Sequence, residues 1–177
     1  MFRVLVSALF LSMAPVVSAF AQGVSGFAMS QGVWSVETRF TDENGEWGEP
    51  AASHASGQTT LGGAFHELDV AVPFPGAVFQ MRMSLGYDRF NQRYRVVVLD
   101  DLNGYTDLYD GEGEAGAPIQ VTNLNSGTGF PTSEGGYVFG RLTFEDTETG
   151  FAILAESAVD GGESWAPFMR MVFEPRN

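Results

Sequence analysis

Hydrophobic and polar residues alternate along much of the chain with a period of two, the pattern of β-strands that have one buried face. The clearest run covers residues 78–87, where one face carries only large apolar or aromatic side chains: Phe79, Met81, Met83, Leu85 and Tyr87. Gln80, Arg82 and Ser84 fall on the opposite face. Similar runs cover residues 33–40, 52–60, 64–72, 92–100, 104–110, 117–124, 136–145, 151–158 and 166–174. The pattern predicts about ten strands.

Turn sequences rich in Gly, Asn and Asp separate these runs. Examples are residues 42–45, 102–104, 148–150 and 160–162, where Gly and Asn tolerate the positive φ of tight hairpins. No amphipathic helix longer than about three turns is evident, although residues 24–31 are suited to a short helix before the first strand. We therefore expect an all-β antiparallel domain, either a sandwich or a closed barrel, and parallel α/β architectures are disfavoured.

The amino terminus has the three parts of a secretory signal peptide. Arg3 supplies a positive charge, residues 4–17 are mostly apolar, and Ala19 and Ala21 place small residues at the −3 and −1 positions of a cleavage site. A retained membrane anchor is the alternative, but the apolar stretch is shorter than the roughly 20 residues that span a bilayer. We expect cleavage after Ala21, no stable membrane anchor, and a periplasmic or secreted product. No cysteine follows, which excludes a bacterial lipoprotein.

Removal of residues 1–21 from the 177 leaves 156 residues, the size of one domain covering residues 22–177. The net charge of −13 becomes −14 when Arg3 is lost with the signal peptide. Such an acidic protein repels nucleic acids and anionic lipid headgroups. The chain has no cysteine, so no disulfide can cross-link the fold. Its stability must come from a hydrophobic core, to which the aromatic residues contribute large buried areas.

Two residues near the ends of the domain favour a barrel over a sandwich. Gly32-Val33-Trp34 opens the first expected strand, and Arg170 lies in the last one. This pairing resembles the lipocalin-like (calycin) barrels, in which a Gly-x-Trp tryptophan near the start packs under an arginine from the final strand and closes one end. The resemblance implies a structural cation–π contact between Trp34 and Arg170, worth about 0.5–2 kcal/mol.

Further motifs along the mature chain carry the same resemblance. They are Gly57, Leu61–Phe65, Gly86–Asp88, Tyr94, Asp100, Tyr109–Gly111, Asp160–Gly162 and Trp165–Arg170. In this order and spacing they resemble the pattern of an uncharacterised bacterial family of lipocalin-like barrels. The resemblance implies an antiparallel barrel of about ten strands and no established reaction.

The segment Asp160-Gly161-Gly162-Glu163-Ser164-Trp165 also resembles the Asp-box of sialidase-type propellers. An Asp-box folds a hairpin: its Asp accepts turn N–H groups and its Trp packs beneath. The motif occurs once, whereas a propeller needs repeated blades. We therefore interpret Asp160, Gly162 and Trp165 as structural residues of one hairpin.

Residues suited to catalysis or metal binding are scarce. The two histidines are His54 and His66, and His66-Glu67 lacks the second histidine of a zinc H-E-x-x-H motif. Acidic residues gather between 100 and 114, but without the register of a calcium loop, which favours a solvated hairpin. No Gly-x-Ser-x-Gly elbow surrounds a serine. The sequence predicts no metal site, no cofactor and no catalytic residue.

The expected barrel interior provides the leading functional hypothesis, which is the binding of a small hydrophobic molecule. A ten-stranded barrel is wider than the eight-stranded kind that holds one small ligand, and methionine-rich walls are adaptable. The expected ligand-binding residues are the apolar face of 79–87 and a few polar side chains: His66, Phe79, Met81, Arg82, Met83, Leu85, Tyr87, Tyr94 and Tyr109. Arg82 belongs to this set only if its strand bends or its face is assigned wrongly. A packed core with no cavity is the alternative.

Two other classes of function stay open at this level. An enzyme would need a polar pair inside the barrel, such as His66 with a buried carboxylate. A structural or interaction module of the cell envelope would have a filled barrel and an exposed apolar patch. Periodicity does not distinguish these classes, nor does it determine the oligomeric state or the role of the acidic segment 100–114.

Overall fold

The structure is a computed structural model that describes residues 32–74, 76–114 and 117–176. The expected signal peptide (1–21) and the expected short helix (24–31) lie outside the described residues.

The described residues are almost entirely strands, as the alternation predicts. A single 3₁₀ turn among them, η2 (Leu61–Gly63), joins two strands. The strands are β1 (Gly32–Phe40), β2 (Ala51–Thr60), β3 (Phe65–Phe74), β4 (Ala77–Asp88), β5 (Arg93–Asp100), β6 (Thr106–Gly111), β7 (Ile119–Thr122), β8 (Phe130–Pro131), β9 (Tyr137–Asp146), β10 (Phe151–Ala158) and β11 (Ala166–Pro175). Each expected strand is present within a few residues of its expected ends, and the two-residue β8 is the addition.

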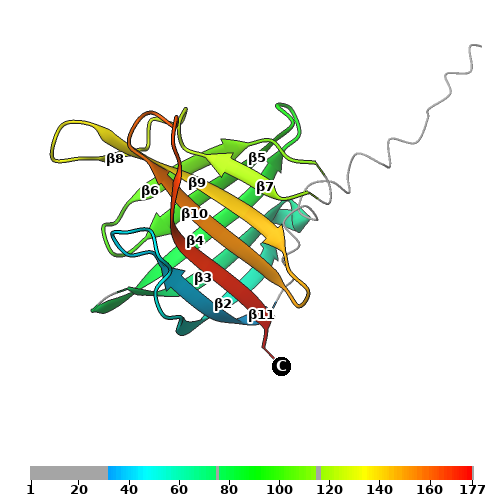
Figure 1. The fold of residues 1–177 in the computed structure, drawn as a ribbon. Helices are drawn as coiled ribbons and strands as arrows, with labels where there is room; N and C mark the ends of the chain where they lie inside the picture. Colours follow the sequence, from blue (N-terminus) through cyan, green and yellow to red (C-terminus); the bar gives the residue numbers. More distant parts are fainter. Residues whose placement is uncertain (1–31, 75, 115–116, 177) are drawn as a thin grey trace, which may run out of the picture.

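Within the described residues, ten of the strands form a closed antiparallel barrel (Figure 1). Neighbouring strands pair in the order β10-β11-β1-β2-β3-β4-β5-β6-β7-β9, and the pairing of β9 with β10 closes the ring. The short β8 pairs with β9 outside this ring. The all-β barrel prediction is confirmed, and closure removes the exposed strand edges that an open sheet would leave.

Alternation along each strand decides which side chains enter the barrel. On β4, Met81, Met83 and Leu85 are buried, whereas Gln80 and Arg82, on the opposite face, are exposed. The inner faces of the other strands build one continuous hydrophobic core with β4. Burial of that apolar surface is the main favourable contribution to folding in a chain without disulfides.

One end of the barrel, here called the Trp34 end, is filled by aromatic side chains. Trp34 meets Phe151 edge to face, with ring centroids 5.1 Å apart. Phe151 in turn stacks on Phe173 at a centroid distance of 4.2 Å. All three side chains are buried, so this end is a packed core.

The expected contact of Arg170 with Trp34 is wrong. Trp34 lies opposite Pro175 in the β1–β11 ladder, and Arg170, five residues before Pro175, lies opposite Arg39. Arg170 is also exposed on the outer face, where it pairs with Glu145 at 3.0 Å. Because alternate residues of a strand point to opposite faces, an outward Arg170 cannot reach an inward Trp34. Phe151, which contacts the Trp34 ring, takes the place expected for the arginine.

The Asp-box-like segment forms the connection from β10 to β11. Asp160 Oδ1 accepts a hydrogen bond from the Ser164 amide at 3.1 Å, and this bond lowers the pKa of Asp160. Gly161 and Gly162 adopt positive φ values of 74° and 91°, which a side chain would make strained. The arrangement places Trp165 directly before β11.

Candidate functional site

A cavity of about 330 Å³ occupies the opposite end of the barrel, here called the Asp100 end. It is bounded by the ends of β1, β3 and β5, the starts of β4 and β11, and parts of β6, β9 and β10. Its lining residues are mostly aromatic and aliphatic: Phe40, Phe74, Phe79, Met81, Met83, Val98, Asp100, Leu102, Asn103, Tyr109, Phe130, Leu142, Ala155, Phe168 and Met169.

The inner part of the cavity is apolar and adaptable. Met81, Met83 and Met169 are each 7 % exposed or less and line it from β4 and β11. Unbranched thioether side chains adapt to irregular apolar shapes. Ala155, on β10, has a short side chain that leaves space in this wall.

The outer part of the cavity is aromatic and open to solvent. Phe40, Phe74 and Phe79 form an edge-to-face cluster, with centroid distances of 5.5 Å and 6.3 Å along the series. Phe74, Leu102 and Phe168 line the cavity and are also exposed on the protein surface. These partly exposed side chains form the mouth through which an apolar molecule can enter.

Three lining residues carry polar groups, namely Asp100, Asn103 and Tyr109. Asp100 is the last inward-facing residue of β5, two positions beyond Val98. Its Oδ1 accepts a hydrogen bond from the Asn103 amide at 2.8 Å, which holds the carboxylate at the mouth. The cavity therefore combines an apolar interior with a few fixed polar groups, as small-molecule sites do.

Tyr109 is the polar group deepest in the wall. Burial, and secondly the charge of Asp107, raise the pKa of Tyr109, so its phenol stays neutral. Gly140 makes room for it: a Cβ atom at position 140 would lie 2.6 Å from the Tyr109 hydroxyl oxygen. The lack of a side chain at Gly140 is thus a requirement for the Tyr109 position.

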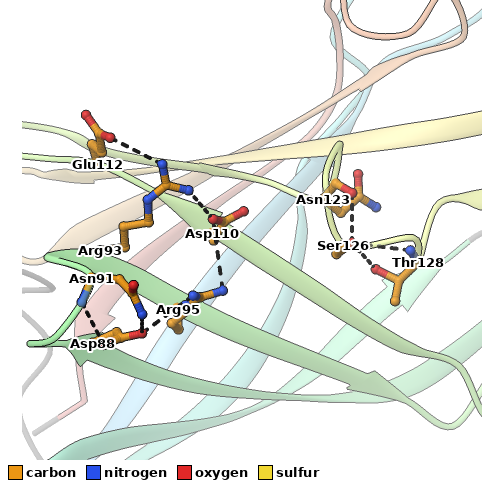
Figure 2. A network of polar contacts seen from close by, with 9 residues as sticks. All are labelled: Asp88, Asn91, Arg93, Arg95, Asp110, Glu112, Asn123, Ser126 and Thr128. Carbon is orange, nitrogen blue, oxygen red and sulfur yellow. Dashed lines mark hydrogen bonds and ion pairs between the residues drawn. The ribbon is translucent and has the colours of Figure 1, made fainter.

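A buried carboxylate beside Tyr109 fixes the segment that follows β7. Asp107 is 2 % exposed. It accepts hydrogen bonds from Asn123 Nδ2 at 3.0 and 2.9 Å, from the Thr128 hydroxyl, and from the Leu108 amide at 3.0 Å. Asn123 Oδ1 in turn accepts the Gly140 amide at 2.7 Å. We call Asp107, Asn123 and Thr128 the Asp107 latch; Asn123 and Thr128 are labelled in Figure 2.

The Asp107 latch positions Phe130 at the cavity. The Tyr105 hydroxyl donates to the carbonyl oxygen of Thr128, and the Tyr105 ring stacks on Phe130 at a centroid distance of 4.2 Å. Phe130 lines the cavity and also a second hollow of about 370 Å³, whose other lining residues come from β6, β9, β10 and β11. Tyr109 and Phe168 line both spaces, so the two adjoin.

A protein family model matches residues 26–174, and its description is a protein of unknown function, DUF1579. The chain belongs to the DUF1579 family. No curated protein matches the sequence. The DUF1579 match covers every strand of the barrel and ends one residue before the end of β11, and it brings no known reaction or ligand to the site.

The structure brings four of the nine expected ligand-binding residues to this cavity: Phe79, Met81, Met83 and Tyr109. Leu85 and Tyr94 are buried toward the Trp34 end, and the Tyr87 ring meets the Tyr94 ring there at 5.1 Å. The face from Phe79 to Tyr87 is about 27 Å long at about 3.4 Å per residue. One strand face therefore lines the cavity at one end of the barrel and packs in the core at the other.

Arg82 lies on the outer face of β4, where regular alternation places it. Its Nε donates to Asp69 Oδ1 at 2.6 Å, and its side chain is 54 % exposed. The strand does not bend there, because the register with β3 and β5 is continuous on both sides of Arg82. Arg82 is therefore not a wall residue of the cavity.

His66 is fully buried on the inner face of β3, away from the lining of the cavity. Neither ring nitrogen has a hydrogen-bond partner among the described residues. Burial lowers the pKa of His66, so the imidazole is neutral. His54, by contrast, is exposed on the outer face of β2.

Sequence patterns missed Asp100, Asn103, Phe130 and Phe168 as lining residues. Asp100 alone had a usable signal, since it continues the inward series Tyr94, Val96 and Val98. The other three lie at or beyond strand ends, where their position depends on how the barrel closes.

Across the described ranges, no group of three or more His, Asp or Glu side chains is arranged to hold a metal ion. The same residues include no helix that is long and apolar enough to cross a membrane.

Proposed function

We propose that this protein is exported and binds a small hydrophobic molecule in the cavity at the Asp100 end of the barrel. The observation that carries the proposal is the cavity itself, an apolar space inside a closed barrel with a mouth of exposed aromatic side chains. Phe79, Met81, Met83 and Tyr109 are the proposed contact residues. The resemblance to lipocalin-like barrels of bacteria, given by the sequence motifs, supports the same class of function.

The size of the cavity limits the ligand. Binding pockets of proteins usually measure about 300–1,000 Å³, so 330 Å³ lies at the small end. An apolar cavity of about 150 Å³ holds one benzene molecule, and a space twice that size accepts roughly twelve non-hydrogen atoms. A medium-length alkyl chain or a bicyclic compound fits this limit, and the adjoining hollow leaves room for a larger group.

An enzyme that uses His66 is less well supported. His66 does not line the cavity, and no described carboxylate bonds either ring nitrogen. A general base must lie within hydrogen-bond reach of the proton that it removes.

Native mass spectrometry of the protein purified from the exported fraction tests this proposal. We expect a chain that begins at Gln22 and carries a stoichiometric apolar molecule, which denaturing extraction then releases for identification. A chain that still contains residues 1–21 contradicts cleavage of the signal peptide, and absence of the protein from the exported fraction contradicts export. An empty protein that also fails to take up a neutral hydrophobic dye contradicts ligand binding and favours an interaction module that uses the exposed aromatic mouth.

A further inference from the structure

The charges around the cavity restrict the head group of its ligand. Asp100 is the one ionisable carboxylate among the lining residues, and no arginine or histidine lines the cavity. The sequence contains no lysine, so arginine provides every permanent positive charge of the side chains. A ligand with an anionic head would therefore find one carboxylate at the mouth and no cation to pair with.

Six of the eight arginines in the described part of the chain pair with carboxylates of residues that do not line the cavity. Arg93 pairs with Asp110 at 2.7 Å, and Arg95 lies between Asp88 and Asp110 at 3.5 and 4.0 Å. Figure 2 shows this network beside β5 and β6, and Arg93 and Arg95 alternate with the inward Tyr94 and Val96, which places them on the outer face. Ion pairs with other carboxylates also involve Arg39, Arg82, Arg141 and Arg170.

Asp100 is available to a ligand. One carboxylate oxygen, Oδ1, accepts the Asn103 amide. Among the described residues, no ion pair involves Asp100. The carboxylate lines the cavity while remaining partly exposed, so it can attract a cation without being fully desolvated.

The aromatic cluster at the mouth favours the same kind of head group. Phe40, Phe74 and Phe79 line the cavity together with Asp100. Phe79 lies two residues before Met81, which is the direct partner of Asp100 in the β4–β5 ladder. Aromatic faces attract alkylammonium groups through their quadrupole, and they do not attract carboxylates.

We propose that the cavity selects amphiphiles with a cationic alkylammonium head, which binds at Asp100 beside the phenylalanine cluster while the alkyl tail enters the methionine-lined interior. This selectivity rests on the proposed binding function of the same cavity. Fatty-acid anions of equal tail length are rejected by the carboxylate of Asp100.

The test compares three probes that share one tail: decyltrimethylammonium, decanol and decanoate, each below its micelle concentration. Their binding to the full mature protein is measured by displacement of a neutral dye. We expect the cation to bind about tenfold or more tightly than the anion, with the alcohol between them.

The variant Asp100→Asn and its matched control Asp101→Asn separate a local effect from net charge. Each removes one negative charge from the same turn, and each native carboxylate accepts one backbone amide, from Asn103 and Gln80 respectively. We expect Asp100→Asn to reduce the cation-to-anion preference about tenfold and Asp101→Asn to preserve it. At 1 M salt the Debye length is about 3 Å, so distant charges are screened. The difference in cation-to-anion preference between the two variants should then mostly remain, because it comes from direct contact with Asp100.

The outcomes distinguish this inference from the proposal on which it rests. If decanol binds but the wild type prefers decanoate, or if both variants change the preference equally, the cationic selectivity is wrong and the binding function stands. If the dye binds but none of the three probes displaces it, the cationic selectivity is wrong and the binding function stands. If the dye itself does not bind, both proposals fail.

Discussion

The guanidinium carbon of Arg141 lies over the ring of Trp165, 4.6 Å from its centroid. Two further contacts hold the same side chain, since Nε and Nη2 of Arg141 each donate to a different oxygen of Glu156 at 2.7 Å. Arg141 and Glu156 face each other across β9 and β10. Arg141 therefore ties the β9–β10 pair that closes the barrel to the turn that precedes β11.

Replacement of Arg141 by lysine should lower the free energy of unfolding by about 1–2 kcal/mol, because lysine cannot keep the two-point contact with Glu156 or the stacking on Trp165. Urea denaturation provides the measurement. Arg170→Lys is the matched control: the exposed pair of Arg170 with Glu145 should contribute within about 0.5 kcal/mol. Equal losses in both variants would contradict the structural role of Arg141.

This arginine also shows where prediction from sequence ends. A Gly-x-Trp start and an arginine in the last strand led to the expectation of a Trp34–Arg170 contact, yet the tryptophan under an arginine is Trp165 and the arginine is Arg141. The motifs identify the strands correctly. Which two side chains meet depends on the register between strands far apart in sequence, and a shift of one residue moves a side chain to the other face.

His66 should make the protein sensitive to mild acid. Above pH 6.5, the ordinary pKa of histidine, the imidazole is neutral in both states and contributes no pH dependence. Below pH 6.5, His66 binds a proton in the unfolded chain but not in the folded protein, because burial lowers its folded-state pKa. Stability then falls as the pH decreases, by at most about 1.4 kcal/mol per pH unit, until the pH reaches the folded pKa.

Unfolding measured from pH 8 down to about pH 5 checks this expectation, in a range above the ordinary carboxyl pKa. His66→Leu should remove the loss of stability in that window and, at pH 8, be at least as stable as the wild type, because two buried nitrogens without partners disappear. His54→Gln, at an exposed position, should behave like the wild type. A His66→Leu protein that keeps the full acid sensitivity would show that another group titrates.

Asp107→Asn should loosen the segment from Asn123 to Thr128. In the native protein, Asn123 Nδ2 donates to both carboxylate oxygens of Asp107. The replacement exchanges one of these acceptor oxygens for an NH₂ donor that faces the Asn123 NH₂ group. We expect a loss of about 1.5–3 kcal/mol in unfolding free energy and faster hydrogen exchange at the amides of Leu108, Ser126 and Thr128. Asp101→Asn, at an exposed position, is the control. Unchanged exchange at these amides in Asp107→Asn would contradict the Asp107 latch.

The cavity is a second feature that the sequence pattern alone does not predict. Alternation in residues 78–87 identifies the inner face of β4 correctly, but the same pattern fits a cavity wall and a packed core. The structure contains both, because Met81 and Met83 border the open space while Leu85 lies in the core toward Trp34. Whether empty space remains at a given height inside the barrel depends on the volumes of side chains from several other strands, such as the short Ala155 on β10.

Filling the cavity from Ala155 tests the central claim most directly. Ala155 is 1 % exposed and lines the cavity, so Ala155→Leu places extra carbon atoms in the proposed ligand space. Ala52→Leu adds the same group at an exposed position on the outer face of β2 and serves as the control. Circular dichroism and thermal unfolding establish that both variants fold, since overpacking costs about 1–3 kcal/mol.

The measurement is a fluorescence titration of the mature protein with a neutral hydrophobic dye. The account predicts saturable binding to the wild type and to Ala52→Leu, and an affinity at least about tenfold weaker for a folded Ala155→Leu, the factor that corresponds to about 1.4 kcal/mol. A folded Ala155→Leu protein that binds the dye as tightly as the wild type would contradict ligand binding inside the barrel and place the dye on the outer surface.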